Sequence, residues 1–427
     1  MRFTGAVLIV VILAMGVVGC GSPHRLQALA SNREPSVSVR LSRERITASV
    51  TSIRPERAVP APVHLSQLKR SNTWDNLHFS SDLTGYRWGF MDGNFNMQRT
   101  TDGGRRWLDL SLPAAYSSAL ESRGPNPTPF VEVADGASIY VLTNDSKQFT
   151  VLQADDSGRH WRVHKFALPR SEFALESVTM VRGGVGWAIF RDAAAGTSHD
   201  LVRFQTRAPK MQIQHVAPGS RDAGLVGTTQ ATVKFRDERC GWIVAVAADG
   251  KLHDYLTSDG GATWHARTIP APSGLTHFMC VRAYKPVMHE QEGTFVARYL
   301  GTDAGHAVVR TVVYHTNDGG THLQATVAQT LDDATSDYMG HPVHWLDSDS
   351  GYAIRDGRLT VTNDSGRLWH NVPSPALETA LPRYPRVLAI QFLSQTEGFV
   401  HLQSRDYAHT VLLKTVDGGT TWDRMCE

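Results

Sequence analysis

The stretch "TTDGGRRW", Thr100 to Trp107, brings an acid, two glycines and a tryptophan into one short segment. Glycine adopts positive φ at little steric cost, so a glycine pair suits the turn between two antiparallel strands. The carboxylate of Asp102 can accept hydrogen bonds from backbone N–H groups inside such a turn. Burying the indole of Trp107 between two sheets would stabilise the fold by on the order of 3 kcal/mol. The stretch therefore predicts a β-hairpin closed by a buried ring.

Close copies of this stretch recur along the chain. They are "ADDSGRHW" around Asp156, "TSDGGATW" around Asp259, "TNDGGTHL" around Asp318, "TNDSGRLW" around Asp364 and "TVDGGTTW" around Asp417. Successive aspartates are separated by 54, 103, 59, 46 and 53 residues, so the double interval predicts that one copy has been lost near Thr206. Seven units of roughly 50 residues each are typical of the blades of a β-propeller.

A second signal lies upstream of most copies, where a glycine precedes an aromatic residue in a strand-like run. The segments are "GYRWGF" from Gly85, "GWAIF" from Gly186, "GWIVAVA" from Gly241, "GYAI" from Gly351 and "GFVHL" from Gly398, with "ASIYVL" and "GTFVARYL" in the units of Asp156 and Asp318. Each unit then contains about four short strands separated by turn signals. We predict an all-β fold, a seven-bladed β-propeller of four-stranded antiparallel blades.

The pattern Ser/Thr-x-Asp-x-Gly-x-x-Trp resembles the Asp-box, or BNR repeat, over nearly all of the chain after Trp74. Ala154 and Leu323 depart from it, the first at the hydroxyl position and the second at the tryptophan position. The arrangement is similar to the Ycf48-like and sialidase-superfamily propellers. This resemblance implies that the repeated residues are structural: Asp102, Trp107, Asp156, Trp161, Asp259, Trp264, Asp318, Asp364, Trp369, Asp417 and Trp422.

The resemblance leaves two function classes open. Ycf48-like propellers act as binding platforms in membrane-protein assembly, and we expect a non-catalytic platform for a protein or glycan partner. The Arg-Ile-Pro motif of sialidases is absent from the sequence, and we identify no catalytic residue. An extracellular glycoside hydrolase of the Asp-box type remains the alternative, because several acids lie in predicted loops: Asp237, Glu238, Glu290, Glu292, Asp332 and Asp333.

Two short segments were considered as metal sites. "DSDSG" from Asp347 has the alternating oxygens of a calcium loop, and "HPVH" from His341 to His344 has two imidazoles, but neither completes a ligand set. We therefore expect no metal and no cofactor. The formal net charge is only +2, which gives no indication of a nucleic-acid partner.

The N-terminus predicts export and anchoring. Arg2 precedes an apolar run that is too short to span a bilayer and ends in "VVGC", Val17 to Cys20, which is similar to the lipobox of bacterial lipoproteins. We expect residues 1–19 to be a signal peptide, residues 20–70 a lipidated tether and residues 71–427 the propeller. Lipid on Cys20 would hold the protein at the extracytoplasmic face of the cell membrane. An ordinary signal peptide is the alternative.

The remaining cysteines and one long loop give finer expectations. A disulfide between Cys240 and Cys280 is our preference, because these residues fall in neighbouring repeats, although buried thiols fit equally well. Arg383, Tyr384 and Arg386 lie in a loop that exceeds what a blade needs, and they offer cationic and aromatic groups of the kind found at interfaces. We expect them to form a partner surface.

The anchor can be tested by replacing the lipid acceptor. Cys20→Ser should release the protein into the medium or leave its precursor uncleaved, as seen by fractionation and the mass of the mature chain. Unaltered processing and membrane retention would contradict lipidation at Cys20.

Overall fold

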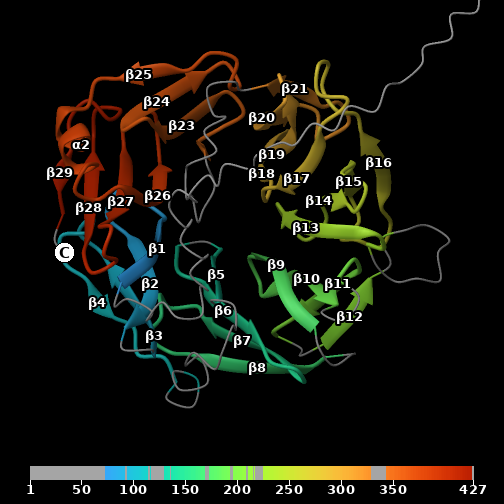
Figure 1. Cartoon of the computed structure of the whole chain (residues 1–427). Helices are drawn as coiled ribbons and strands as arrows, with labels where there is room; N and C mark the ends of the chain where they lie inside the picture. The colour runs from blue at the N-terminus through green and yellow to red at the C-terminus, as the bar shows by residue number, and fades with distance from the viewer. Residues whose placement is uncertain are drawn as a thin grey trace, which may run out of the picture. The chain divides into compact units, whose positions relative to one another are not determined.

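The computed structural model describes residues 73–91, 94–113, 116, 129–134, 136–168, 173–192, 196–207, 210–214, 216, 225–327 and 343–425. Within these residues seven antiparallel sheets follow one another around a ring (Figure 1). The fold is therefore all-β, a seven-bladed β-propeller of four-stranded blades, as the repeat predicts. The proposed signal peptide and the tether with Cys20 lie outside the described residues.

Each blade is an antiparallel meander of consecutive strands. Blade 1 contains β1 (Thr73–Phe79), β2 (Gly85–Met91), β3 (Asn94–Thr100) and β4 (Leu108–Asp109), and blade 2 contains β5 (Phe130–Val133), β6 (Ile139–Asn144), β7 (Gln148–Ala154) and β8 (Arg162–Ala167). Blade 3 contains β9 (Phe173–Val181), β10 (Val185–Asp192), β11 (His199–Gln205) and β12 (Lys210–Gln214). Blade 4 contains β13 (Thr228–Phe235), β14 (Gly241–Ala247), β15 (Leu252–Thr257) and β16 (His265–Ile269). Blade 5 contains β17 (Met279–Ala283), β18 (Val287–His289), β19 (Glu292–Asp303), β20 (His306–Thr316) and β21 (Gln324–Val327). Blade 6 contains β22 (His344–Trp345), β23 (Ser350–Arg355), β24 (Arg358–Asn363) and β25 (His370–Val372). Blade 7 contains β26 (Arg386–Phe392), β27 (Gly398–Gln403), β28 (Thr410–Thr415) and β29 (Asp423–Arg424).

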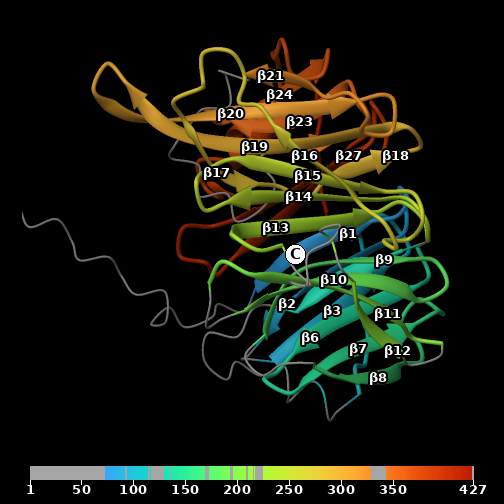
Figure 2. The ribbon, with the colours of Figure 1, turned by 90° about the vertical axis from the view of Figure 1, so that its right-hand side faces the viewer.

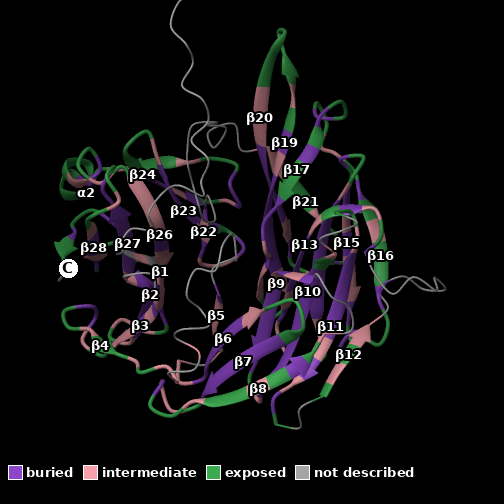
Figure 3. Ribbon diagram, turned by 60° about the horizontal axis from the view of Figure 1, so that its bottom comes forward, coloured by how far each residue is buried: buried purple, intermediate pink, exposed green. Residues whose placement is uncertain are grey.

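The first strand of each blade faces the axis of the ring, because first strands of neighbouring blades contact one another at several junctions. Blade 5 differs from the others in two ways. Its first strand is divided into β17 and β18, which both pair with β19. Its middle hairpin, β19–β20, is long and projects from the ring with an exposed tip (Figures 2 and 3).

In six of the seven blades a glycine of the second strand lies opposite a large side chain of the first strand; in blade 2 Ile139 takes the place of the glycine. Gly85 pairs with Phe79, Gly241 with Phe235 and Gly398 with Phe392. A Cβ atom on Gly241 would lie 2.4 Å from the Phe235 ring, and the other two glycines are covered as closely. We call the first-strand residue opposite this glycine the ring position. The glycine of the repeated "Gly-aromatic" signal is therefore required because a ring lies flat against it.

The aspartate-containing turns join the third and fourth strands and are held by local hydrogen bonds. In blade 4 the Thr257 hydroxyl donates to Asp259 Oδ1 at 2.8 Å, and the Thr263 N–H donates to the same oxygen at 2.9 Å. Gly260 and Gly261 have positive φ values of 76° and 90°. The indole of Trp264 donates to the Gly261 carbonyl at 3.1 Å, which fixes the ring over its own turn. We call each of these segments an Asp turn.

One hydrogen bond recurs in all seven blades and links the two turns at the same end of the sheet. An N–H of the third-to-fourth strand turn donates to a carbonyl of the first-to-second strand turn, for example Gly103 to Leu83 at 2.9 Å and Gly319 to Gln291 at 2.7 Å. Blade 3 has no aspartate in this turn, yet Thr206 still donates to Gly184 at 2.9 Å. Blade 3 is therefore the predicted repeat that has lost its Asp turn.

The ring closes between blades 7 and 1 through side chains, because neither terminal blade takes a strand from the other. The rings of Phe79 and Phe399 stack with centroids 3.5 Å apart. The Gln391 side chain accepts from Phe79 N and donates to Phe79 O, both at 2.8 Å. Lys414 adds a hydrogen bond of 2.9 Å to the Asp82 carbonyl.

A single turn of helix fills the connection between blades 6 and 7. This helix, α2 (Pro375–Ala380), buries Leu377, and Leu381 follows it into the same core cluster as Trp422. Among the described residues, no helix is long and apolar enough to cross a membrane.

The packing role of the Asp-turn tryptophans can be measured at Trp264, which is 4% exposed and lies edge-on to Phe235. Trp264→Ala should lower the free energy of unfolding by about 3–5 kcal/mol, because it removes a buried ring and leaves a cavity. Leu323→Ala, at the equivalent but half-buried position of blade 5, is the matched control and should cost less. Equal effects in urea unfolding would argue against the indole as the stabilising group.

A second prediction concerns the loss of folding stability at acidic pH. His401 in β27 is 2% exposed, and burial, assisted by the positive charge of Arg87, lowers its pKa to about 3. Since the unfolded imidazole has a pKa near 6.5, stability that is present above pH 6.5 is lost as the pH falls toward 3, by on the order of 5 kcal/mol in full. In urea unfolding at pH 7 and pH 4, His401→Gln should lose less stability than the wild type. His370→Gln, at an exposed site, should behave as wild type. Identical pH dependence in all three proteins would refute the assignment.

Candidate functional site

One position recurs in the first strand of every blade. It precedes the ring position and pairs across the ladder with the residue that follows the glycine of the second strand, or that follows Ile139 in blade 2, which has no such glycine. We call these seven residues the belt; with their partners they are His78 with Tyr86, Glu132 with Tyr140, Thr179 with Trp187, Lys234 with Trp242, Val287 with Thr294, His344 with Tyr352 and Gln391 with Phe399.

Belt side chains contact the first strand of the next blade, because alternate residues of a strand point to opposite faces of its sheet. Gln391 of blade 7 bonds both backbone groups of Phe79 in blade 1. His344 Nε2 of blade 6 donates to the Phe392 carbonyl of blade 7 at 2.9 Å, which places its proton on that nitrogen. The belt therefore fastens neighbouring blades near the axis and also decides which charges lie there.

A cavity of about 550 Å³ lies among the first strands of blades 1, 5, 6 and 7. Its walls are largely apolar, with Leu388 and Ile390 of β26 among them. Its polar groups include His289, His344 and Lys285, the last of which lies in the break between β17 and β18, and Asn76 and Thr294 also line it. We call this space the axial cavity. An apolar cavity with a few converging polar groups is the usual form of a ligand site.

The charges beside the axial cavity are unequal. Lys285 Nζ donates to Glu132 Oε1 at 2.6 Å and to the Val178 carbonyl at 2.7 Å. Burial by itself would raise the pKa of Glu132, but the charges of Lys285 and Lys234 outweigh it and hold the pKa below its usual value. Burial and the neighbouring Lys285 lower the pKa of Lys234. Two ammonium groups thus face one carboxylate that is already paired.

His344 and His78 are held as neutral bases in the folded protein. Burial lowers the pKa of His344 to about 4 and also lowers that of His78. The "HPVH" segment thus contributes His344 to the belt and the axial cavity, while His341 lies outside the described residues. Sequence reasoning missed this role, although the signal was available. His344 immediately precedes the aromatic ring position Trp345, as His78 precedes Phe79.

The Asp-turn aspartates are occupied by their own turns and do not converge on the axis. Hydrogen bonds from the Thr263 hydroxyl and N–H lower the pKa of Asp259 to about 2. Hydrogen bonds from His322 likewise lower the pKa of Asp318. In blade 2, where Ala154 replaces the hydroxyl residue, Asp156 still accepts the N–H groups of Arg159 and His160. These carboxylates accept hydrogen bonds inside their own turns, and the structural role that the resemblance implies stays a prediction.

The residues proposed as a partner surface take separate roles. Arg386 donates to the Tyr407 hydroxyl at 2.6 Å and lies over that ring at 4.1 Å. Tyr384 packs against the core cluster shared by blades 6 and 7. Arg383 is the exposed member of the three. The partner surface remains a prediction, and within the structure only Arg383 has its side chain turned to solvent.

The predicted disulfide between Cys240 and Cys280 is wrong, because both residues are free thiols. Cys240 immediately precedes β14, whereas the Cys280 N–H donates to the Gly250 carbonyl beyond the other end of that strand. A strand of this length separates its ends by about 20 Å, and a disulfide needs Cα atoms about 6 Å apart. Burial raises the pKa of the Cys280 thiol to about 12, which leaves it unreactive.

Of the loop acids named for glycosidic chemistry, Asp332 and Asp333 lie outside the described residues. Asp237 accepts the N–H groups of Arg239 and Cys240, so it shapes a turn. Asp347 does the same for Asp349 and Ser350 in the segment considered for calcium. In the described ranges, no group of three potential His, Cys, Asp or Glu ligands lies together as a metal site would require.

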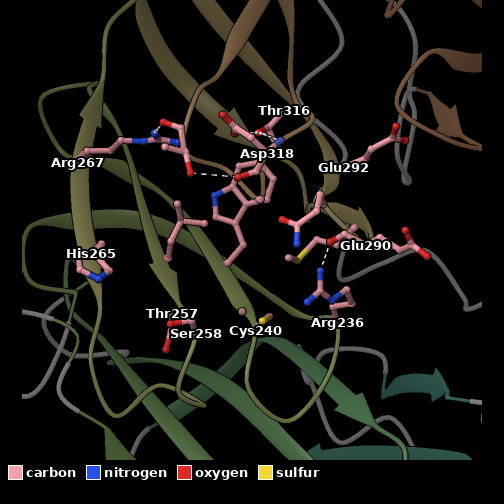
Figure 4. A pocket seen from close by; sticks show the side chains of 18 of the residues that line it. Arg236, Cys240, Thr257, Ser258, His265, Arg267, Glu290, Glu292, Thr316 and Asp318 are labelled. Carbon is pink, nitrogen blue, oxygen red and sulfur yellow. Dashed lines mark hydrogen bonds between the residues drawn. The ribbon is translucent and has the colours of Figure 1, made fainter. Parts of the chain in front are cut away.

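Glu290 and Glu292 line a second hollow, between blades 4 and 5 (Figure 4). It has a volume of about 510 Å³ and lies beside the Asp turns of both blades. We call it the junction pocket.

Fold and axial cavity together define the class of the protein: a β-propeller with a cation-bearing hollow at its axis. No protein-family model matches the sequence, and no curated protein sequence matches it. Solved propellers match its fold. The structure of YCF48 bound to D1 peptide matches with a TM-score of 0.51 and 15% identity, over 84% of this chain and 97% of that one. A post-proline cleaving enzyme from Rickettsia typhi matches with a TM-score of 0.50 and 9% identity, over 85% of this chain and 54% of that one.

The polysaccharide lyase Uly1 is a third solved neighbour, with a TM-score of 0.48 and 8% identity, over 85% of this chain and 96% of that one. At such identities the likeness shows the fold alone. The first two neighbours are a peptide-bound protein and an enzyme, so the propeller by itself does not select a function.

Proposed function

We propose that the protein is a lipid-anchored binding module on the extracytoplasmic face of a bacterial membrane, which holds a polypeptide partner through an anionic group at the axial cavity. The observation that carries this proposal is Lys285, which lines an otherwise largely apolar cavity and belongs to a buried cluster of two lysines, Lys285 and Lys234, around one carboxylate, Glu132. The solved neighbour with a bound peptide supports a polypeptide partner. The anchor rests on the sequence before Cys20.

The charge that we propose a ligand reaches is that of Lys234, which adjoins Glu132 and Lys285 although it is not itself part of the cavity lining. Lys285 is committed to Glu132 and to a backbone carbonyl, whereas Lys234 makes no hydrogen bond with the described residues. A carboxylate of the ligand would therefore offset the cost of keeping the Lys234 ammonium largely buried. Because the region is poorly solvated, the attraction between the two charges is stronger than it would be in bulk water.

The apolar wall decides between kinds of ligand. Leu388 and Ile390 offer surface to an aliphatic or aromatic side chain, so an acidic residue beside an apolar residue in an extended segment fits the cavity. Glu132 is held ionised by its lysine neighbours and accepts a hydrogen bond from the Met180 N–H. We assign Glu132 to structural support of the site and not to proton transfer.

The test uses a labelled acidic peptide, acetyl-Leu-Asp-Leu, and its Asn counterpart, both amidated, in fluorescence anisotropy. The Asp peptide should bind more tightly, and Lys234→Gln should weaken it about tenfold, the loss of one charge contact. Lys251→Gln, at an exposed lysine paired with Asp249, is the control and should leave binding unchanged. Raising the salt concentration should weaken the Asp peptide more than the Asn peptide.

Two outcomes would contradict the proposal. Equal binding of the Asp and Asn peptides to wild type and Lys234→Gln would remove the axial cavity as the anion site. Turnover of aryl glycosides or polysaccharides by the purified protein, abolished by changing one acid, would favour the hydrolase alternative.

A further inference from the structure

Aromatic rings seal several junctions between blades in the same way. The second-strand ring of one blade stacks on the ring position of the next, as Trp187 does on Phe235 with centroids 3.5 Å apart and Tyr352 on Phe392 at 3.6 Å. The Asp-turn tryptophan then lies edge-on, as Trp264 does to Phe235 at 5.9 Å. Three rings thus close the space between the two sheets.

The junction between blades 4 and 5 lacks two of these three rings. The second-strand ring, Trp242, is present, but Met288 occupies the ring position opposite Gly293. Leu323 replaces the Asp-turn tryptophan. A Cβ atom on Gly293 would lie 2.6 Å from Trp242, so this glycine is covered by the preceding blade and not by its own ring position. The junction pocket lies at this junction against Trp242 and Met288, while Leu323 packs against the same core cluster without lining the pocket.

The walls of the junction pocket combine apolar and charged groups (Figure 4). Leu256 and Met288 line it with the deeply placed Trp242. Its two arginines are engaged, since Arg267 binds Asp254 at 2.7 Å and Arg236 binds Asp237 at 3.0 Å.

The two glutamates of the junction pocket differ from its arginines. The carboxylates of Glu290 and Glu292 make no hydrogen bond or ion pair with the described residues. The free charge of the pocket is therefore negative, in contrast to the axial cavity.

We propose that the junction pocket binds an aromatic side chain of a partner polypeptide that has a lysine or arginine next to it. The ring would take the place that the repeat gives to its own aromatic residues, against Met288 and Leu256. The neighbouring cation would pair with Glu290 and Glu292. This site is separate from the axial cavity and needs nothing from the function proposed above.

The probe is acetyl-Phe-Lys-amide, observed by saturation-transfer NMR with the full protein. Transfer to the ring protons should correspond to a dissociation constant on the order of 1 mM, as expected for burial of one ring by a small ligand. Acetyl-Leu-Lys-amide and acetyl-Phe-Glu-amide should bind at least several-fold more weakly. Glu292→Gln should reduce the preference for Lys over Glu.

Two variants refill the pocket from within. Met288→Phe restores the ring position, and Leu323→Trp restores the Asp-turn ring; both should abolish transfer and raise the melting temperature, as cavity filling does. Leu368→Trp adds a tryptophan at a site that is 61% exposed and is the matched control, which should keep full transfer. Lys234→Gln should also keep it, which separates this site from the axial one.

A further measurement covers the case in which a refilled variant does not fold. In the wild type the probe should shift the indole N–H resonance of Trp242, assigned by its loss in Trp242→Phe. The proposal is overturned if the probe gives no transfer to the wild type, if the folded refilled variants bind it as well as the control does, or if the Trp242 resonance does not respond.

Discussion

A large side chain lying flat on a glycine is the contact on which the propeller depends. The glycine starts the second strand, and the side chain ends the first strand of the same blade. At Gly85, Gly241, Gly351 and Gly398 a Cβ atom would lie 2.4 to 2.9 Å from the opposing ring, closer than two carbon atoms can approach. Placing the ring there presents its other face to the neighbouring blade, where the residue after the previous glycine stacks on it. The glycine and the aromatic residue that follows it thus determine both the packing within a blade and the contact between neighbouring blades.

Much of this could be predicted from sequence because the contact is local and repeated. The spacing of the Asp turns predicted seven blades and located the lost copy near Thr206, where blade 3 keeps only the turn-to-turn hydrogen bond. The departure at Leu323 was visible as well. Its consequence was not, because the junction pocket is lined by Met288 and Trp242, and Leu323 is not part of that lining. The place of Met288 depends on the cross-strand register, which fixes it opposite Gly293.

The axial residues were harder to find for a different reason. The belt positions share no residue type, since histidine, glutamate, threonine, lysine, valine and glutamine all occupy them. They share only their position in the pairing between the first and second strands of each blade. Lys285 has no counterpart in the other repeats. It lies in the gap between β17 and β18, from which its side chain reaches Glu132 of blade 2. The disulfide prediction failed for a related reason, since adjacent repeats do not imply adjacent strand ends.

The axial cavity and the junction pocket both lie beside blade 5, where the repeat departs from its usual residues, and this has a physical basis. A regular junction is filled by its own rings, and a well-packed interior leaves no room for a ligand. Blade 5 carries a divided first strand, a non-aromatic ring position and an Asp turn without tryptophan, and it borders both the axial cavity and the junction pocket. Blade 3 is also incomplete, since Met180 lies opposite Gly186 and the blade has no Asp turn. Every blade nevertheless retains the hydrogen bond between its turns. A repeat architecture can therefore tolerate several imperfect units, and blade 5 is the one whose imperfections border both cavities.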